Sequence, residues 1–416
     1  MDGPVRGCQH PRMNTTPADH AGASLATRQQ LLGALQNTLN WSARREYRGH
    51  EKHDGLNSPL LMRVCGGNRL ARLVAIQAVM RSPVDLRRWL AVAPHQNSKG
   101  LALFAQAWMD LADLLPSDPR PSEQAREVLE RLLVTRSAST PSGGRAWGYA
   151  YPWQDPGFYA AAGTPNAVVT SFVCEALLDA HARDRDPRWL AAVDQAVVFF
   201  VHDLVRLKDT PDELCLSYMP LPMRMRVMDV SILIASVLAR HARANGSDQH
   251  MPMARRLLRY VLRQQTDYHA WWYTDPPGDS RIRHDNYHTG FILDALWRWM
   301  QVTGENEHAE SYWAGLEYYR RKLFSDAGEP YWMNDQRFPY DVHGAAQGIL
   351  TFARHADRYP GFAHRIATWT LANLYHPEGR FHYQKRRWHT RRLTFMRWCN
   401  GWMSRALAVL LKESNG

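Results

Sequence analysis

The sequence predicts an all-α protein built as an (α/α)6 toroid of helical hairpins. Three observations predict this fold. Apolar residues recur with the helical period over most of the chain, strand signals are nearly absent, and helix pairs repeat at intervals of 55 to 59 residues. The first helix of each pair is rich in small apolar residues and the second carries more charge, which is typical of inner and outer layers. An open α-solenoid is the alternative that the same repeat allows.

The helical period places thirteen helices, with Pro and Gly between them. The helix 396–412 has no partner after it, and the N-terminal helix 26–40 is expected to pack on it and close the ring. The expected helices span 26–40, 66–80, 98–115, 121–136, 166–183, 188–206, 228–244, 251–266, 287–303, 307–324, 342–357, 360–375 and 396–412.

The repeat is clearest where the inner helices begin. Five of them open at Thr170, Asp229, His288, His343 and Trp398, which are 59, 59, 55 and 55 residues apart, and an aromatic-rich loop precedes each. In a toroid these loops converge at one mouth, beside the partial positive charge of the helix N-termini. Aromatic rings there would stack on sugars or other flat ligands. The candidate binding residues are Trp147, Tyr149, Tyr218, Asp229, Trp271, Trp272, Tyr331, Trp332, Tyr383 and Trp398.

Two of these helix starts carry residue types suited to proton transfer. Asp285 precedes His288 by three residues, and Asp341 precedes His343 by two residues one repeat later. An Asp that orients a His forms a proton shuttle, and an N-cap Asp beside a packed His has the same spacing. The candidate catalytic residues are Asp285, Tyr287, His288, Tyr340, Asp341 and His343.

Two further polar segments are candidates for ligand binding. The loop 47–59 contains Asp54 and Asn57, and long polar loops are often functional, although a solvated connection is the plainer explanation. The tract 379–412 has nine Lys or Arg and neither Asp nor Glu. It suits a polyanion such as an acidic glycan, with Arg386 and Arg387 as candidate contacts, or it is an Arg-rich solvated surface.

Composition narrows the class of protein. The net charge of +11 favours acidic partners, but only 6 of the 51 basic residues are Lys, and such an Arg bias often reflects genome composition. The five Cys are scattered and never spaced CxxC, which excludes a zinc ribbon and favours a reducing cytoplasm. No P-loop, dinucleotide-binding or HExxH motif occurs. We therefore expect neither a metal nor a cofactor, and no nucleic-acid partner.

The chain is expected to form one toroid domain, 26–416, behind a disordered tail, 1–25. The tail is polar and has no apolar run, so it is not read as a signal peptide. The longest uncharged apolar stretch, 230–239, is far shorter than the roughly 20 residues of a membrane-spanning helix.

Several segments resemble the VpsJ-like polysaccharide biosynthesis proteins, which are bacterial proteins found with exopolysaccharide gene sets. The resemblance covers most of 40–412 and implies an α/α toroid similar to prenyltransferase, terpene-cyclase and glycan-processing toroids. The segments that carry it are DGLNS at 54–58, RSPVDLR at 81–87, NSKGLA at 97–102, YHTGF at 287–291 and DVHGAAQ at 341–347.

A second resemblance is to the helical domain of glucuronyl C5-epimerases. It rests on the helix starts 289–292 and 346–348. The chain lacks the long β-rich N-terminal half of those enzymes.

The leading hypothesis is a cytoplasmic enzyme that performs acid–base chemistry on a bacterial glycan, acidic glycans included, or on its precursor. Hydrolysis would use Asp285 and Asp341 as paired carboxylates. Elimination or C5 epimerisation would use His288, His343 and a Tyr such as Tyr287 or Tyr340. A non-catalytic glycan-binding or assembly subunit, working with other polysaccharide-assembly proteins, is the first alternative. A terpene-cyclase-like or prenyltransferase-like enzyme is the second, although no Asp-x-Asp-Asp motif occurs.

Overall fold

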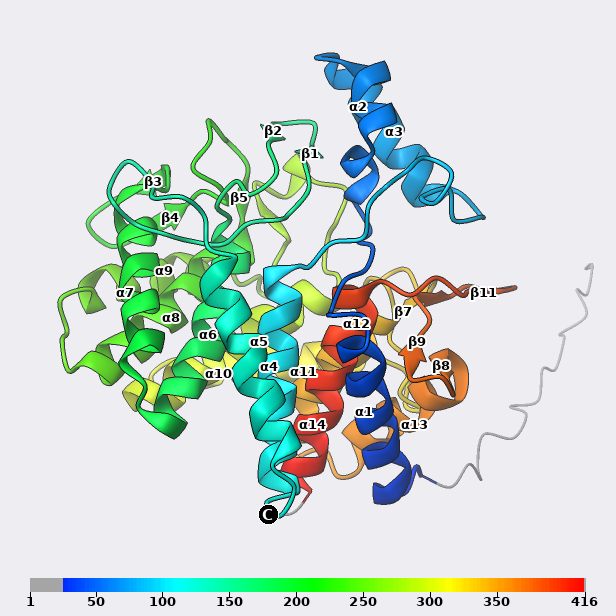
Figure 1. Ribbon diagram of the computed structural model, residues 1–416. Coiled ribbons are helices and arrows are strands. Elements are labelled where there is room, and N and C mark those ends of the chain that lie inside the picture. Colours follow the sequence, from blue (N-terminus) through cyan, green and yellow to red (C-terminus); the bar gives the residue numbers. More distant parts are fainter. Residues whose placement is uncertain (1–24, 415–416) are drawn as a thin grey trace, which may run out of the picture.

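Six helices form the inner wall of a closed ring in the computed structural model, which describes residues 25–414 (Figure 1). Each inner helix packs against the next, and the last packs against the first. The predicted toroid is therefore confirmed, and the open solenoid is wrong. The inner helices are α4 (Ser98–Leu114), α6 (Ala167–Asp184), α8 (Met228–Asn245), α10 (Asn286–Thr303), α12 (Val342–Ala353) and α14 (Trp402–Glu413).

Six outer helices cover this wall, one beside each inner helix. The N-terminal helix packs on α14, so it completes the sixth hairpin as the sequence predicts. The predicted tail, apart from its last residue, lies outside the described residues. The outer helices are α1 (Arg28–Ala43), α5 (Arg120–Val134), α7 (Pro187–His202), α9 (Met251–Arg263), α11 (Ala309–Lys322) and α13 (Phe362–Leu374).

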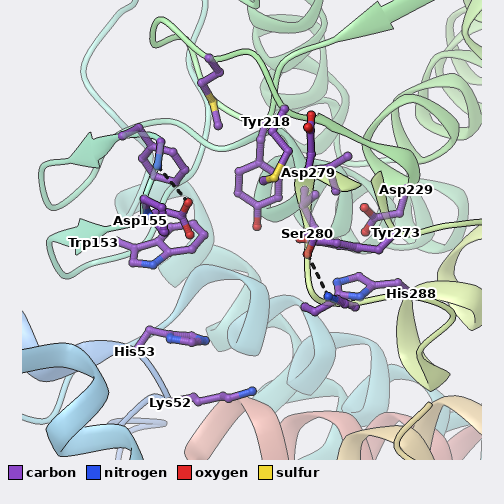
Figure 2. A pocket seen from close by; sticks show the side chains of 18 of the residues that line it. Lys52, His53, Trp153, Asp155, Tyr218, Asp229, Tyr273, Asp279, Ser280 and His288 are labelled. Carbon is purple, nitrogen blue, oxygen red and sulfur yellow. Dashed lines mark hydrogen bonds between the residues drawn. The ribbon is translucent and has the colours of Figure 1, made fainter. Parts of the chain in front are cut away.

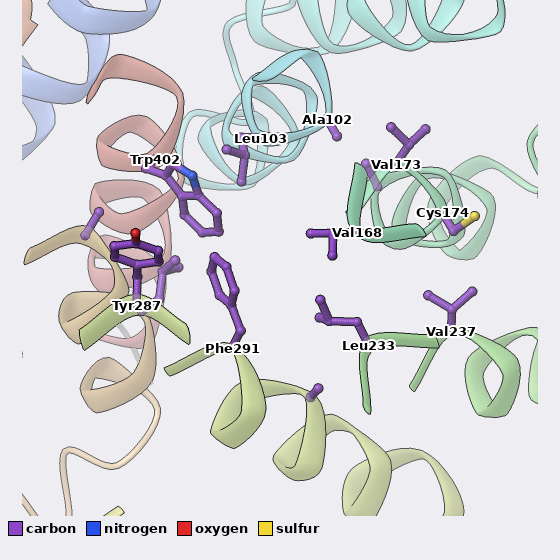
Figure 3. Packing of buried hydrophobic residues seen from close by; sticks show 14 of the residues in the cluster. Ala102, Leu103, Val168, Val173, Cys174, Leu233, Val237, Tyr287, Phe291 and Trp402 are labelled. Carbon is purple, nitrogen blue, oxygen red and sulfur yellow. The ribbon is translucent and has the colours of Figure 1, made fainter. Parts of the chain in front are cut away.

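Apolar side chains from the inner helices fill the axis of the ring. Figure 3 shows Leu103, Val168, Leu233, Phe291 and Trp402 converging there from different helices. The rings of Phe291 and Trp402 stack with centroids 5.3 Å apart. Because this core is filled, the space at the mouth has a solid floor.

A belt of polar pairs joins the inner helices below the core. Arg240 of α8 pairs with Glu175 and Asp179 of α6. Asp294 of α10 pairs with Arg354 of α12. On the other side of the ring, Asp110 of α4 pairs with Arg183 of α6 and with Arg405 and Lys412 of α14. Glu175 and Asp110 are buried, and a buried carboxylate is stable only when it is paired in this way.

The aromatic loops connect neighbouring repeats through the backbone. The carbonyl oxygen of Tyr218 accepts a hydrogen bond from the first amide of α6, at 2.9 Å. Tyr273, Trp332 and Tyr383 do the same for α8, α10 and α12, at 3.0, 3.3 and 3.1 Å. Each loop therefore satisfies a free N–H group of the preceding inner helix, which holds the loops at one end of the ring.

Small residues allow the inner helices to approach closely. A Cβ atom added to Gly290 of α10 would lie 2.2 Å from Cγ of Gln347 in α12. The glycine is therefore required by the contact between α10 and α12.

Eleven short strands within residues 25–414, which the sequence did not predict, pair within and between the loops. Each has two to four residues and pairs antiparallel, so none is long enough to show an alternating pattern. They are β1 (Trp153–Gln154), β2 (Tyr159–Ala160), β3 (Arg206–Asp209), β4 (Leu214–Leu216), β5 (Arg226–Val227), β6 (Thr274–Asp275), β7 (Tyr340–Asp341), β8 (Tyr375–His376), β9 (Arg380–Phe381), β10 (Gln384–Lys385) and β11 (Thr390–Arg391).

A segment between α1 and α4 projects above the ring (Figure 1). It contains a 3-10 turn η1 (Asp54–Asn57), the short helix α2 (Pro59–Cys65) and α3 (Arg69–Arg81), which the sequence predicts at 66–80. Another short turn, η2 (Pro277–Asp279), lies in the loop before α10, and a π-helical turn η3 (Met396–Gly401) leads into α14. Within residues 25–414, no helix has the length and apolar character to cross a membrane.

Candidate functional site

A cavity of about 970 Å³ opens where the aromatic loops and the inner-helix N-termini meet. Figure 2 shows Lys52 and His53 pointing into it from the N-terminal loop, and Asp229, Tyr273 and His288 from another wall. Four of the predicted aromatic binding residues line it, namely Tyr149, Tyr218, Trp332 and Trp398. The cavity therefore lies where the repeat predicts the site.

An Asp–His pair stands at the start of α10. Asp285 Oδ2 lies 2.8 Å from His288 Nδ1, and Asp285 is buried while His288 lines the cavity. The carboxylate accepts a hydrogen bond from Nδ1–H of the imidazole, which fixes the ring orientation and leaves Nε2 as the unprotonated nitrogen of the neutral ring. The Tyr273 ring packs 4.4 Å from the imidazole.

His343 and Tyr287 form an aromatic wall beside this pair. Their rings stack 4.5 Å apart and almost parallel, and Trp402 stacks on His343 at 4.4 Å. Neither ring nitrogen of His343 has a hydrogen-bond partner in the described chain. Burial and the nearby Lys99 cation hold its pKa well below the usual value. His343 is thus a neutral ring packed into the cavity wall, and both of its nitrogens are buried.

Asp229, at the second position of α8, is the buried carboxyl group of the same wall. It is 2% exposed, and its Oδ1 has no hydrogen-bond partner among the described residues. Burial raises the pKa of this carboxyl, against the opposing charges of His288 and Lys99. A raised pKa lets Asp229 carry a proton more readily than an exposed carboxyl.

Two lysines bring positive charge to the floor of the cavity. Lys99 Nζ lies 3.8 Å from the centroid of Phe172 and 4.5 Å from that of Phe291, and Lys52 Nζ lies 4.8 Å from that of Trp398. Neither makes an ion pair within residues 25–414. Burial lowers the pKa of both ammonium groups. An anionic ligand would favour their charged forms.

The N-terminal loop delivers Lys52 and His53 because buried ion pairs hold it. Glu51 accepts from Arg397 Nη2 at 2.7 Å, and Asp54 accepts from Arg87 Nε at 2.7 Å. Asp54, a predicted binding residue, is therefore committed to Arg87 and fully buried. Asn57, also predicted to bind, donates to the Ala93 carbonyl and does not line the cavity.

Asp341 is placed differently from its counterpart Asp285. Its carboxylate accepts from the His343 amide, from Trp398 Nε1 and from Gln384 Nε2, at 2.9, 2.8 and 2.8 Å. It caps α12 and fixes Trp398, and it does not line the cavity. Tyr340, next to it, packs against Trp369 of α13 and also lies outside the cavity.

Several predicted aromatic contacts serve the core or the outer surface instead. Trp147 and Trp271 are buried, and their indole N–H groups donate to backbone carbonyls of Leu132 and Val261. Trp272 packs on His284, Tyr383 is buried against Phe395, and Tyr331 lies beside Arg337 away from the cavity. A large ring seen in sequence can fill either place, so composition did not separate them.

The C-terminal basic tract is divided between different roles. Arg397 faces the cavity, whereas Arg405 and Lys412 belong to the polar belt. Arg386 and Arg387 are exposed in the turn between β10 and β11 and do not line the cavity.

Sequence reasoning missed Lys52, His53, Lys99, Tyr151 and Trp153 as cavity residues. Lys99 had a usable signal, because a lone Lys stands there at the start of an otherwise apolar inner helix. Tyr151 and Trp153 continue the aromatic loop after Tyr149. Within residues 25–414, no three His, Cys, Asp or Glu side chains are grouped as metal ligands would be.

No family model and no curated protein sequence matches the chain. Solved structures match its fold. A GH76 α-mannanase of Bacteroides thetaiotaomicron has a TM-score of 0.56 at 13% identity, over 76% of this chain and 85% of that one. The cellobiose 2-epimerase of Bacillus thermoamylovorans has a TM-score of 0.57 at 10% identity, over 77% and 90%. A possible GH105 family member from Salmonella enterica has a TM-score of 0.58 at 11% identity, over 99% of both chains. Because the sequence identities are so low, these likenesses show the α/α toroid fold alone.

Proposed function

We propose that the protein is an enzyme that performs acid–base chemistry on an acidic glycan or its precursor. The observation that carries the proposal is the oriented Asp285–His288 pair beside the buried Asp229 in one cavity. The fold neighbours support a sugar substrate, because they are named as a mannanase, an epimerase and a possible GH105 member. The aromatic rings around the cavity suit stacking on sugar faces.

The positive floor favours a carboxylate-bearing sugar. Lys52, Lys99 and Arg397 all line the cavity, and Arg397 is already paired with Glu51. The two unpaired ammonium groups would neutralise the substrate carboxylate. This neutralisation makes the proton on the adjacent ring carbon easier to remove, because the charge that develops on the carboxylate is stabilised.

His288 Nε2 would take that proton, and the C–H electron pair would pass into the carboxylate. The protonated imidazole would be stabilised by Asp285. If an acid then delivers a proton to the opposite face, the carbon is inverted. If instead the neighbouring C–O bond breaks, its electron pair leaves with the oxygen, which an acid protonates, and an unsaturated sugar forms. Asp229 lies on the same wall as His288, so it is our candidate acid for the elimination, in which it would protonate the leaving oxygen.

Hydrolysis by Asp285 and Asp341 fits this geometry less well. Asp341 makes three hydrogen bonds and lies outside the cavity, so it cannot serve as the second carboxylate.

A role in bacterial exopolysaccharide biosynthesis is proposed on the VpsJ-like segments alone. A reducing compartment is proposed on the cysteines, because Cys65, Cys174, Cys215 and Cys399 are all free and buried.

The test is proton exchange at the carbon next to the carboxylate. The protein is incubated with uronic-acid oligosaccharides in D₂O, and NMR follows loss of that proton signal, while absorbance follows any unsaturated product. We expect exchange with wild type, loss of exchange with His288→Gln, and no effect from His389→Asn, which changes an exposed histidine between β10 and β11.

Two results would count against the proposal. Retention of exchange by His288→Gln would remove the proposed base. Glycan binding without chemistry in wild type, unaltered by His288→Gln, would favour the non-catalytic glycan-binding subunit.

A further inference from the structure

The segment that projects above the ring exposes an apolar face. Leu60 and Val64 of α2 are 54% and 84% exposed, and Leu70 and Val74 of α3 are 69% and 59% exposed. We call these four residues the α2–α3 face. Each pair is four residues apart, so each occupies one side of its helix. Such large apolar side chains in water mark an interaction surface.

Within the segment 55–84, which carries this face, the charge has one sign. Between Gly55 and Val84 the chain has four Arg and neither Asp nor Glu. Arg63, Arg69 and Arg81 are exposed and make no ion pair with any residue from 25 to 414. Exposed apolar side chains beside unpaired arginines are the two kinds of group that bind an anionic membrane surface.

A second element beside α3 has the same character. Arg391 of β11 donates to the carbonyls of Met80 and Ser82, which ties the β10–β11 hairpin to the end of α3. In the turn of that hairpin, Trp388 is 83% exposed, with Arg387 over its ring at 4.8 Å. Trp at an interface with basic neighbours is a typical membrane anchor.

We propose that the α2–α3 face docks on the surface of an anionic lipid bilayer. Charge complementarity selects this occupant. A second copy would bring arginines against arginines with no acidic residue in 55–84 to neutralise them. A soluble acidic polysaccharide would pair with the arginines but would leave Leu60, Val64, Leu70 and Val74 in water. A bilayer with anionic headgroups satisfies both kinds of side chain.

This docking would place the cavity near the membrane. The helix α3 packs against β1, and Trp153 of β1 lines the cavity. Arg72 of α3 also lies over the Tyr159 ring of β2, 4.2 Å from its centroid. The inference does not rest on the proposed function, because the docking residues lie outside the cavity.

Vesicle co-sedimentation of the full chain tests the proposal. We expect binding to vesicles of phosphatidylcholine mixed with phosphatidylglycerol and none to phosphatidylcholine alone. Val64→Glu should weaken binding by about tenfold or more, since charge replaces an inserted apolar group. Val134→Glu is the matched control, because Val134 of α5 is also 84% exposed. Changing Arg63, Arg69 and Arg81 to Gln should weaken binding and flatten its salt dependence.

Near-UV circular dichroism shows that each variant keeps its fold. Absence of vesicle binding, or equal loss in Val64→Glu and Val134→Glu, would overturn the proposal. A dimer in light scattering that Val64→Glu dissociates, without vesicle binding, would identify a second copy as the occupant. If a soluble acidic polysaccharide displaces the protein from vesicles, and if Val64→Glu does not change this displacement, the surface binds a glycan and not a bilayer. Lys99→Met should bind vesicles like wild type, because Lys99 lines the cavity and does not belong to the α2–α3 face. The vesicle assay therefore tests the docking independently of the proposed function.

Discussion

At the scale of single residues, similar sequence signals led to different roles. Asp285 and Asp341 both stand before an inner-helix histidine, yet Asp285 contacts the His288 ring whereas Asp341 accepts the His343 amide. The difference arises from one residue of spacing. A gap of three brings a side chain back over the preceding helix turn, whereas a gap of two leaves the carboxylate on the backbone N–H.

Asp285→Asn should reduce turnover on an acidic oligosaccharide by about 100-fold or more, because an amide cannot stabilise the imidazolium formed on His288. Substrate binding should change little, since Asp285 lies behind the imidazole. The rate of proton exchange by NMR measures this. Asp194→Asn is the matched control, because Asp194 pairs with His241 at 2.6 Å outside the cavity. Equal effects of the two changes would contradict the assignment.

Lys99→Met should raise thermal stability at neutral pH. Burial lowers the pKa of Lys99 in the folded protein below 10.5, so the unfolded chain binds more protons between the two values. Wild-type stability therefore rises with pH across that window, and the advantage of Lys99→Met shrinks as pH approaches 10.5. Melting temperatures of both proteins over this range measure the difference. Affinity for acidic oligosaccharides should fall at the same time. A lower melting temperature at neutral pH would contradict the role of Lys99 as a destabilising buried cation.

At the scale of elements, the inner helices are specialised along their length. Their N-terminal ends carry the cavity groups Asp229, His288 and His343, and their later turns carry the polar belt. The belt lies away from the site, and most of its charges are paired. We therefore assign stability to one end of the ring and chemistry to the other.

Arg240→Met should destabilise the fold by about 1–3 kcal/mol, because the buried Glu175 and the half-buried Asp179 would lose a shared charged partner. Urea unfolding followed by circular dichroism measures the change. Arg255→Met is the control. Its pair with Glu305 is exposed, so the cost should be about 0–1 kcal/mol. Similar costs for both variants would show that the belt adds little to stability.

At the scale of the whole molecule, ring closure depends on helices from opposite ends of the chain. The helix α1 packs on α14, and Leu35 and Leu39 of α1 are fully buried there. Closure joins the first hairpin to the last, so the hairpins share one continuous core.

Leu35→Ala should cost about 2–5 kcal/mol, because it leaves a cavity in that core. The loss should lower one cooperative transition, seen equally by far-UV and near-UV circular dichroism. Leu60→Ala, at an exposed site, should cost about 0.5 kcal/mol or less. A separate early transition in Leu35→Ala would show that α1 melts independently of the ring.

The sequence by itself determined the helical repeat, the pairing of helices and the end of the ring where the cavity opens. These follow from local periodicity, and the recurrence of Asp229, His288 and His343 at one register places them at one mouth.

The tertiary structure decided which side chains face the cavity. Trp147 and Tyr149 belong to one loop, yet one pins the core and the other lines the site. Lys52 and Lys99 meet in the cavity because the fold, through the pairs of Glu51 with Arg397 and Asp54 with Arg87, brings their distant segments together. Ion pairs between residues so far apart in the sequence cannot be predicted from local sequence pattern, because they form only when the chain is folded.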